Sequence, residues 1–82
     1  MTRDEWIAAF ARETGVNRPS IEEIRDLLDL AGRAAHASER TAAPLACWIA
    51  GHSDLSLAQL LEAADRVSGS ASDEPAPDPQ DD

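Results

Sequence analysis

The stretch from Ala35 to Gly51, AHASERTAAPLACWIAG, constrains the fold more than any other part of the chain. Its second half carries no charge, and Pro44 stands at the start of that half. Proline has no amide hydrogen and disfavours helical geometry in the residue before it, so regular helix should begin near Pro44, with Thr41 or Ala43 as the cap. Apolar residues all round this helix predict a short, central, buried element that ends at Gly51.

Three further helices are expected around it from the spacing of capping residues. A Ser or Thr that is followed three positions later by Glu or Gln satisfies two of the free amides at a helix start. This spacing occurs at Thr2 and Glu5, at Ser20 and Glu23, and at Ser56 and Gln59. Gly15 and Gly69 supply stops for the first and last helices.

The apolar side chains recur every three to four residues, and no strand-like alternation is present. Trp6 is interpreted as a core anchor of the first helix. Trp48 and Ile49, together with Cys47 as a small hydrophobe, are assigned to the core through the third helix. The chain is therefore predicted to be all-α, a compact bundle of four helices with a short central third helix. Its 82 residues allow a single domain, over residues 1–69, with a small core.

Residues 70–82 are expected to form a disordered acidic tail, because Ser, Asp, Glu and Pro dominate them and cannot bury enough apolar surface. Five acidic residues there, Asp73, Glu74, Asp78, Asp81 and Asp82, account for much of the formal net charge of -9. An acidic chain without a basic stripe argues against nucleic-acid binding.

No membrane span is expected, since no stretch approaches the roughly 18 apolar residues that cross a bilayer. The first residues lack the apolar run of a signal peptide, and the single cysteine has no partner for an internal disulfide. A cytoplasmic location is therefore predicted.

No complete catalytic or metal-binding motif is present. His36, Cys47 and His52 are the only His and Cys residues, and their spacing matches no compact zinc pattern. Cys47 lies within the least polar run of the chain, where no neighbouring group would activate its thiol. We therefore expect no catalytic residue, no metal and no cofactor.

The junction in front of Pro44 carries the best candidate for a binding site. Free amides at a helix start attract anions, and His36, Ser38, Arg40 and Thr41 add donors around them. These four residues suit a phosphate or a carboxylate. In the alternative interpretation, which we favour, Arg40 pairs with Glu39 or an acid of the last helix, and Ser38 and Thr41 only cap the junction.

A resemblance covers the same region. The residues that carry it run from His36 through Ser38, Glu39, Arg40, Thr41, Ala42, Ala43 and Pro44 to Cys47, Trp48, Ala50 and Gly51. This run resembles the signature of a small actinobacterial helical domain of unknown function, and Trp6 and the Arg-rich, Lys-free composition are similar too. The resemblance covers residues 1–69.

In that family the domain occurs both as a free protein and fused to molybdenum-cofactor guanylyltransferases. The resemblance therefore implies a place in molybdopterin guanine dinucleotide biosynthesis. The transferase chemistry itself is not expected here, because the chain has no Gly-rich nucleotide loop and no alternation of strands and helices.

These observations predict a non-catalytic accessory or protein-interaction module, whose partner is a molybdenum-cofactor guanylyltransferase or another protein. The alternative is a small-ligand domain that binds a phosphorylated metabolite or a nucleotide at the junction of the second and third helices. The sequence leaves the identity of the partner and the oligomeric state open.

Overall fold

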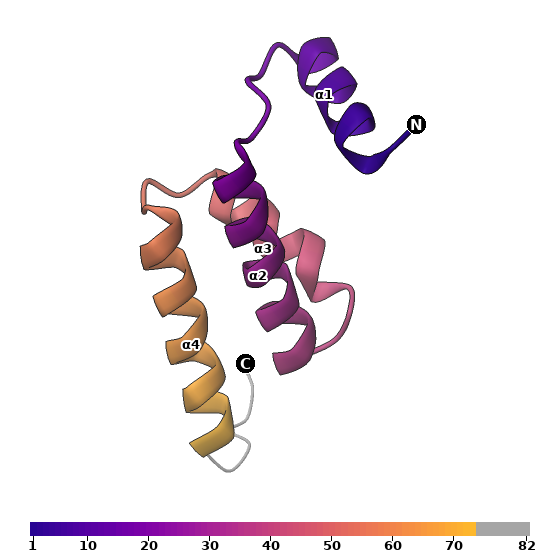
Figure 1. Cartoon of the computed structure of the whole chain (residues 1–82). Helices are drawn as coiled ribbons and strands as arrows, with labels where there is room; N and C mark the ends of the chain where they lie inside the picture. The colour runs from indigo at the N-terminus through magenta and orange to yellow at the C-terminus, as the bar shows by residue number, and fades with distance from the viewer. Residues whose placement is uncertain (74–82) are drawn as a thin grey trace.

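The computed structural model describes residues 1–73, which form four helices and no strand (Figure 1). The helices are α1 (Arg3–Thr14), α2 (Ile21–Ala37), α3 (Ala42–Gly51) and α4 (Leu57–Asp73). The predicted all-α fold of four helices is confirmed.

The expected capping residues start α1, α2 and α4. The Ser20 hydroxyl accepts a hydrogen bond from the Glu23 amide (3.1 Å), and the Glu23 carboxylate accepts one from the Ser20 amide (2.7 Å). Thr2 with Glu5, and Ser56 with Gln59, form the same reciprocal pair. Gly15 ends α1 at a φ of 77°, which glycine adopts without steric cost. The local sequence is therefore sufficient to start these three helices.

Helix α3 begins at Ala42, two residues ahead of Pro44, so Thr41 rather than Ala43 stands at the cap position and Pro44 lies in the first turn. The amides of Ala42 and Ala43 donate to the carbonyl oxygens of Glu39 and Arg40, at 2.8 Å and 3.2 Å. This hydrogen-bonded turn leads directly into the helix. Pro44 is tolerated because amides in a first turn have no helical partner to lose.

Helix α2 lies between α3 and α4 and packs against both (Figure 1). We call α2, α3 and α4 together the three-helix unit. Leu30 of α2 is 5% exposed and is the only large side chain that is buried among the described residues; Ala50 of α3 is buried as well. The hydrophobic core is therefore small and is centred on α2.

Helix α1 stands apart from the three-helix unit (Figure 1). Trp6 and Phe10 stack on each other with ring centroids 5.0 Å apart, and 52% and 54% of their surfaces remain exposed. The prediction that Trp6 anchors the core is therefore wrong. Its ring packs on Phe10, in the next turn of its own helix, and about half of it stays in solvent.

The assignment of Trp48 and Ile49 to the core is also wrong, since they are 65% and 62% exposed. Cys47 is half-buried. The reason is geometric: α3 is apolar all round, but α2 covers it on one side only, and no other described element covers the opposite side. An apolar helix surface therefore faces solvent.

Helix α4 continues past Gly69, its expected end, to Asp73. Glycine lowers helix propensity by about 1 kcal/mol relative to alanine but does not by itself end a helix. The rest of the predicted tail, residues 74–82, lies outside the described residues. Within residues 1–73, no helix is both long and apolar enough to cross a membrane.

Candidate functional site

The solvent-facing side of α3 carries a group of large side chains. Leu45, Trp48, Ile49 and His52 follow one another at intervals of three and four residues, so they project from one side of the helix. We call these four residues the α3 face. Its three apolar members are 62–65% exposed, and no residue from 42 to 51 is charged. Contiguous apolar surface of this kind marks a site of contact with another molecule.

Trp48 and His52 contact each other on the α3 face. Their ring centroids are 4.0 Å apart, and the His52 Nδ1 lies 2.9 Å from the carbonyl oxygen of Trp48. A carbonyl oxygen only accepts, so Nδ1 carries the hydrogen in this contact. The contact restrains the indole on the surface, and aromatic anchors of limited mobility are typical of the centres of protein interfaces.

An apolar groove of about 460 Å³ lies beside the α3 face, lined by α2, α3 and α4. Seven alanines from the three helices give it a shallow apolar lining. Leu45 and Ile49 of α3 and Leu60 and Val67 of α4 also line it. Val67 is 70% exposed, and the two α3 side chains are exposed to a similar degree, so the groove is open to solvent.

The four residues predicted to form an anion site, His36, Ser38, Arg40 and Thr41, all lie exposed at the α2–α3 junction. Across residues 1–73, none of their side chains takes part in a hydrogen bond or an ion pair. The first amides of α3 are not available to an anion, because two donate to backbone carbonyls and Pro44 has none. The anion site stays a prediction, and it now depends on these side chains without the helix amides.

The alternative interpretation of the junction, a staple made by Arg40, is wrong. Within the described part of the chain Arg40 has no ion pair with Glu39 or with an acid of α4. Thr41 stands at the cap position, but its backbone is already helical (φ -69°, ψ -11°) and its side chain accepts no capping bond. The junction is held by backbone hydrogen bonds instead.

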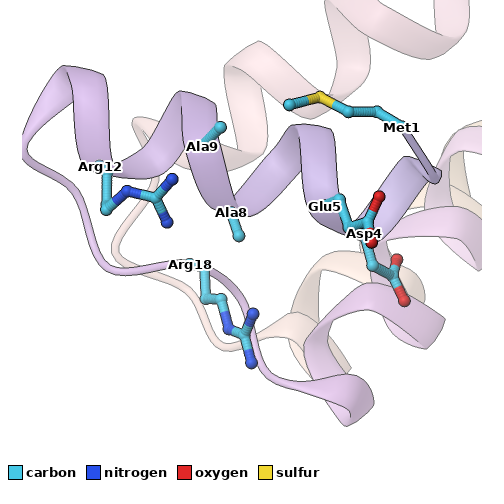
Figure 2. A pocket seen from close by; sticks show the side chains of 7 residues that line it. All are labelled: Met1, Asp4, Glu5, Ala8, Ala9, Arg12 and Arg18. Atoms are coloured by element: carbon cyan, nitrogen blue, oxygen red, sulfur yellow. The ribbon is translucent and has the colours of Figure 1, made fainter.

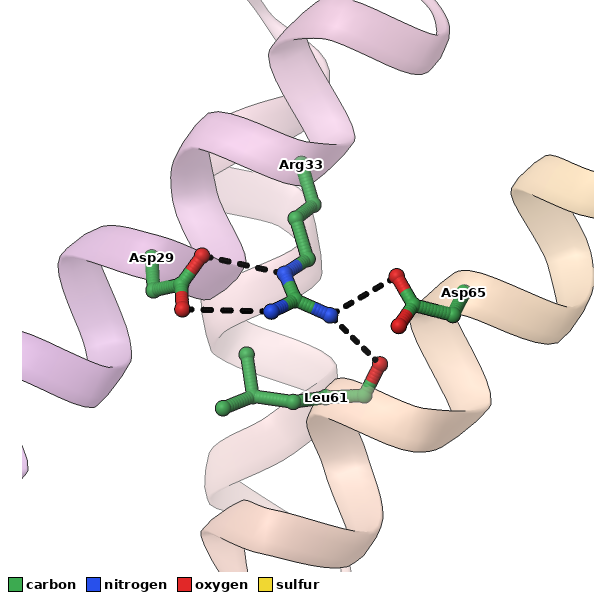
Figure 3. Close-up of polar contacts among 4 residues, drawn as sticks. All are labelled: Asp29, Arg33, Leu61 and Asp65. Carbon is green, nitrogen blue, oxygen red and sulfur yellow. Dashed lines mark hydrogen bonds and ion pairs between the residues drawn. The ribbon is translucent and has the colours of Figure 1, made fainter.

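Arg33 is the residue that joins α2 to α4 (Figure 3). Its Nε and Nη2 donate to the two carboxylate oxygens of Asp29, at 3.0 Å and 3.2 Å. Its Nη1 reaches α4, where it lies 2.7 Å from the Asp65 carboxylate and 3.2 Å from the Leu61 carbonyl oxygen. The hydrogen bond with Asp29, followed by that with Asp65, raises the pKa of Arg33 above its ordinary value.

Sequence reasoning missed this role of Arg33. The spacing of Asp29 and Arg33 by four residues was a visible signal of a helical ion pair. The contact with Asp65 depends on how α4 packs and had no signal in the sequence. Because four acceptors already surround the guanidinium, we interpret Arg33 as part of the fold rather than as a ligand-binding group.

A second hollow, of about 410 Å³, lies along α1 (Figure 2). Arg12 and Arg18 lie at one end of it, and Asp4 and Glu5 lie at the other. All four residues are exposed. Because charges of both signs share an open surface, the hollow does not select an anion or a cation.

No metal centre is formed by the described residues: nowhere among them do three or more His, Cys, Asp or Glu side chains come together in a way that could hold an ion. Cys47 is a free, half-buried thiol. The surfaces that stand out chemically are therefore apolar ones, namely the α3 face and the apolar groove.

Comparison with protein-family models places the chain in a family. Residues 1–79 match the model of DUF6457, a domain of unknown function, so the chain belongs to that family. The match extends beyond residue 69, where the resemblance was expected to end, into the acidic segment. Searches of the curated proteins and of the solved structures found no match.

Proposed function

We propose that this member of the DUF6457 family is a protein-interaction module that binds a partner protein through the α3 face. The observation that carries this proposal is the exposure of Leu45, Trp48 and Ile49, which are 62–65% accessible on a helix without a charged residue. Large apolar side chains in a contiguous patch are costly to leave in water unless another surface covers them.

Covering this surface contributes a favourable term to binding, and the other contacts of the interface have to supply the rest, because association also costs translational and rotational freedom. Fully burying an aliphatic or aromatic side chain contributes roughly 1.5–3 kcal/mol, so covering the two-thirds of each that is exposed contributes roughly 1–2 kcal/mol. Tryptophan is among the residues that dominate interface energies. Trp48 is therefore the expected hot spot of the α3 face.

The partner proposed first is a molybdenum-cofactor guanylyltransferase. The support is the resemblance of residues 36–51 to a domain that is fused to such enzymes, and most of the α3 face lies in that stretch. In this proposal the chain is an accessory module, and the transfer chemistry belongs to the larger enzyme.

The test is a binding titration between the full chain and a purified guanylyltransferase from the same organism. We expect Trp48→Ala to weaken binding at least about tenfold, because a hot-spot residue contributes about 2 kcal/mol or more. Leu28→Ala is the matched control, since Leu28 is 54% exposed but lies on α2, outside the α3 face. Circular dichroism checks that both variants keep the helical content of the wild type.

Two results would contradict the proposal at different levels. If the wild type does not bind the guanylyltransferase, this partner is wrong. If a partner binds but tolerates Trp48→Ala as well as it tolerates Leu28→Ala, the α3 face is not the binding surface.

A further inference from the structure

We propose that the apolar groove of the three-helix unit receives helix α1 of a second copy of this chain, so that the protein is a symmetric homodimer. This inference goes beyond the proposed function, because it needs no protein of another kind. It also rests on other observations, namely the unpartnered aromatic pair of α1 and the open groove.

The first observation is the state of α1. Trp6 and Phe10 stack as a pair on one side of this helix, and each keeps about half of its surface in water. Arg3, Asp4, Arg12 and Glu13 are exposed as well, so the aromatic pair stands out on a short helix that is otherwise largely polar. Helices bind in grooves through a few large apolar side chains spaced three or four residues apart, which is the spacing of Trp6 and Phe10.

The second observation is the size and lining of the groove. Pockets of roughly 300–1,000 Å³ hold drug-sized molecules, so about 460 Å³ gives room for two aromatic rings. Alanines line much of it, and small residues let a neighbouring helix approach closely. Leu45 and Ile49 of α3 and Val67 of α4 would then flank the incoming helix.

A helix fits the groove better than a small apolar ligand does. Ligand sites enclose most of the surface of their ligand, whereas three of the side chains that line this groove, Leu45, Ile49 and Val67, remain 62–70% exposed. Three helices with an open apolar groove lack one element of a four-helix bundle, and a helix laid along the groove would complete it.

The position of α1 favours a second copy over the chain's own α1. In the structure α1 meets the start of α2, where Asp4 and Ile7 line a hollow together with Ile21 and Ile24. On α2 the groove begins at Leu30, which lies nine residues, or about 14 Å, beyond Ile21. In a two-fold dimer, each α1 fills the groove of the other chain. Both exposed surfaces are then covered at once, and α1 keeps its position at the start of α2.

The area is sufficient for a stable dimer. A helix of 12 residues is about 18 Å long and about 10 Å across, so half of its curved surface measures about 16 Å by 18 Å, or roughly 300 Å². Two such contacts, each burying both the helix and the groove, bury roughly 1,200 Å², which is the lower end of specific interfaces.

Charge predicts how this dimer responds to salt. Each chain carries a formal charge of -9, so two copies repel each other at low ionic strength. Salt screens that repulsion but leaves apolar burial in place. The homodimer is therefore expected to tighten as NaCl is raised, whereas a complex with a basic partner would weaken.

The first test is sedimentation equilibrium of the full chain from micromolar concentrations to about 1 mM, at low and high NaCl. We expect a monomer–dimer equilibrium that shifts toward the dimer in high salt. Trp6→Ala/Phe10→Ala should weaken dimerisation at least about tenfold. Its helical content should be unchanged, because both rings are already half exposed in one chain. Val16→Ala is the control, since Val16 is 64% exposed and belongs to neither surface.

The second test shows which α1 enters the groove. Glu13→Cys, one turn from Phe10 on α1, is placed in one chain and Ala63→Cys, in the groove, in a second chain of different mass, both in a Cys47→Ser background. A disulfide needs Cα atoms within about 7 Å, so a mixed disulfide on oxidation reports α1 of one chain in the groove of the other. Both substitutions in a single chain should likewise yield covalent dimers.

Each of four results would overturn the inference. In sedimentation, these are a monomer throughout the concentration range, or a dimer that is insensitive to Trp6→Ala/Phe10→Ala. In cross-linking, the result is an internal disulfide in the doubly substituted chain. The fourth is a small apolar molecule that copurifies with the monomer and is displaced by Ala63→Trp. Leu45 and Ile49 belong both to the groove and to the α3 face, whereas Trp48 lies outside the groove. The effect of Trp48→Ala on binding of a guanylyltransferase therefore distinguishes the failure of one proposal from the failure of the other.

Discussion

Ser20 and Thr41 stand at the same position of two helices, yet only Ser20 acts as a cap. The backbone of Ser20 is extended (φ -72°, ψ 170°), which turns its hydroxyl toward the Glu23 amide. The backbone of Thr41 is helical, and the turn before it already pairs the amides that a cap would satisfy. Residue type allowed a cap at both positions, and backbone geometry selected one.

This difference predicts the effect of removing each hydroxyl. Ser20→Ala should lower the free energy of unfolding by about 1 kcal/mol, within the range of about 0.5–2 kcal/mol for lost caps. Thr41→Ala should change it by less than about 0.5 kcal/mol, as for an exposed surface residue. Urea unfolding followed by circular dichroism measures both. Equal losses would show that Thr41 caps α3 in solution.

At the scale of helices, α3 shows why an apolar pattern does not by itself place a helix in a core. The run from Leu45 to Ala50 has the composition of a buried helix, and the sequence analysis assigned it to the core. Burial requires a neighbour on each side, and among the described elements only α2 packs closely against α3. This apolar pattern is the surface through which we propose that a partner binds, whereas the candidate anion site predicted from the sequence lies at the polar residues in front of Pro44.

The pairing of α2 with α4 depends on Arg33 in a way that can be measured. Arg33→Gln should lower the Tm, because it removes the ion pairs with Asp29 and Asp65 and the bond to the Leu61 carbonyl. Arg25→Gln is the control, since Arg25 is exposed on the same helix and makes no ion pair among the described residues. Raising the NaCl concentration should reduce the difference between the two variants. Equal Tm values for both variants at low salt would contradict this role.

At the scale of the whole molecule, the division between α1 and the three-helix unit decides how stability is organised. Only Leu30 among the larger side chains is buried in the described chain, whereas Trp6, Trp48 and Val67 are more than half exposed. A single chain therefore holds little core, and covering the exposed apolar surfaces on association would add to its stability.

The corresponding prediction is a Tm that depends on protein concentration. If α1 completes the groove of a second copy, each tenfold rise in concentration should raise the Tm by roughly 3–5 °C, since only the folded dimer gains from mass action. A chain that begins at Gly15 should melt at a Tm that is independent of concentration. Scanning calorimetry over two decades of concentration distinguishes them. A constant Tm for the full chain would argue that association does not contribute to its stability.

The sequence by itself determined the helices, because helix starts and stops are set by hydrogen bonds and backbone angles within a few residues. The reciprocal pairs at Ser20 and Glu23 and the left-handed Gly15 are of this kind. It also marked residues 36–51 as the distinctive region. The tertiary structure alone decided which apolar residues are buried, where Arg33 finds Asp65, and that Trp48 faces solvent. Burial depends on which elements meet in space, and those contacts join residues far apart in the chain.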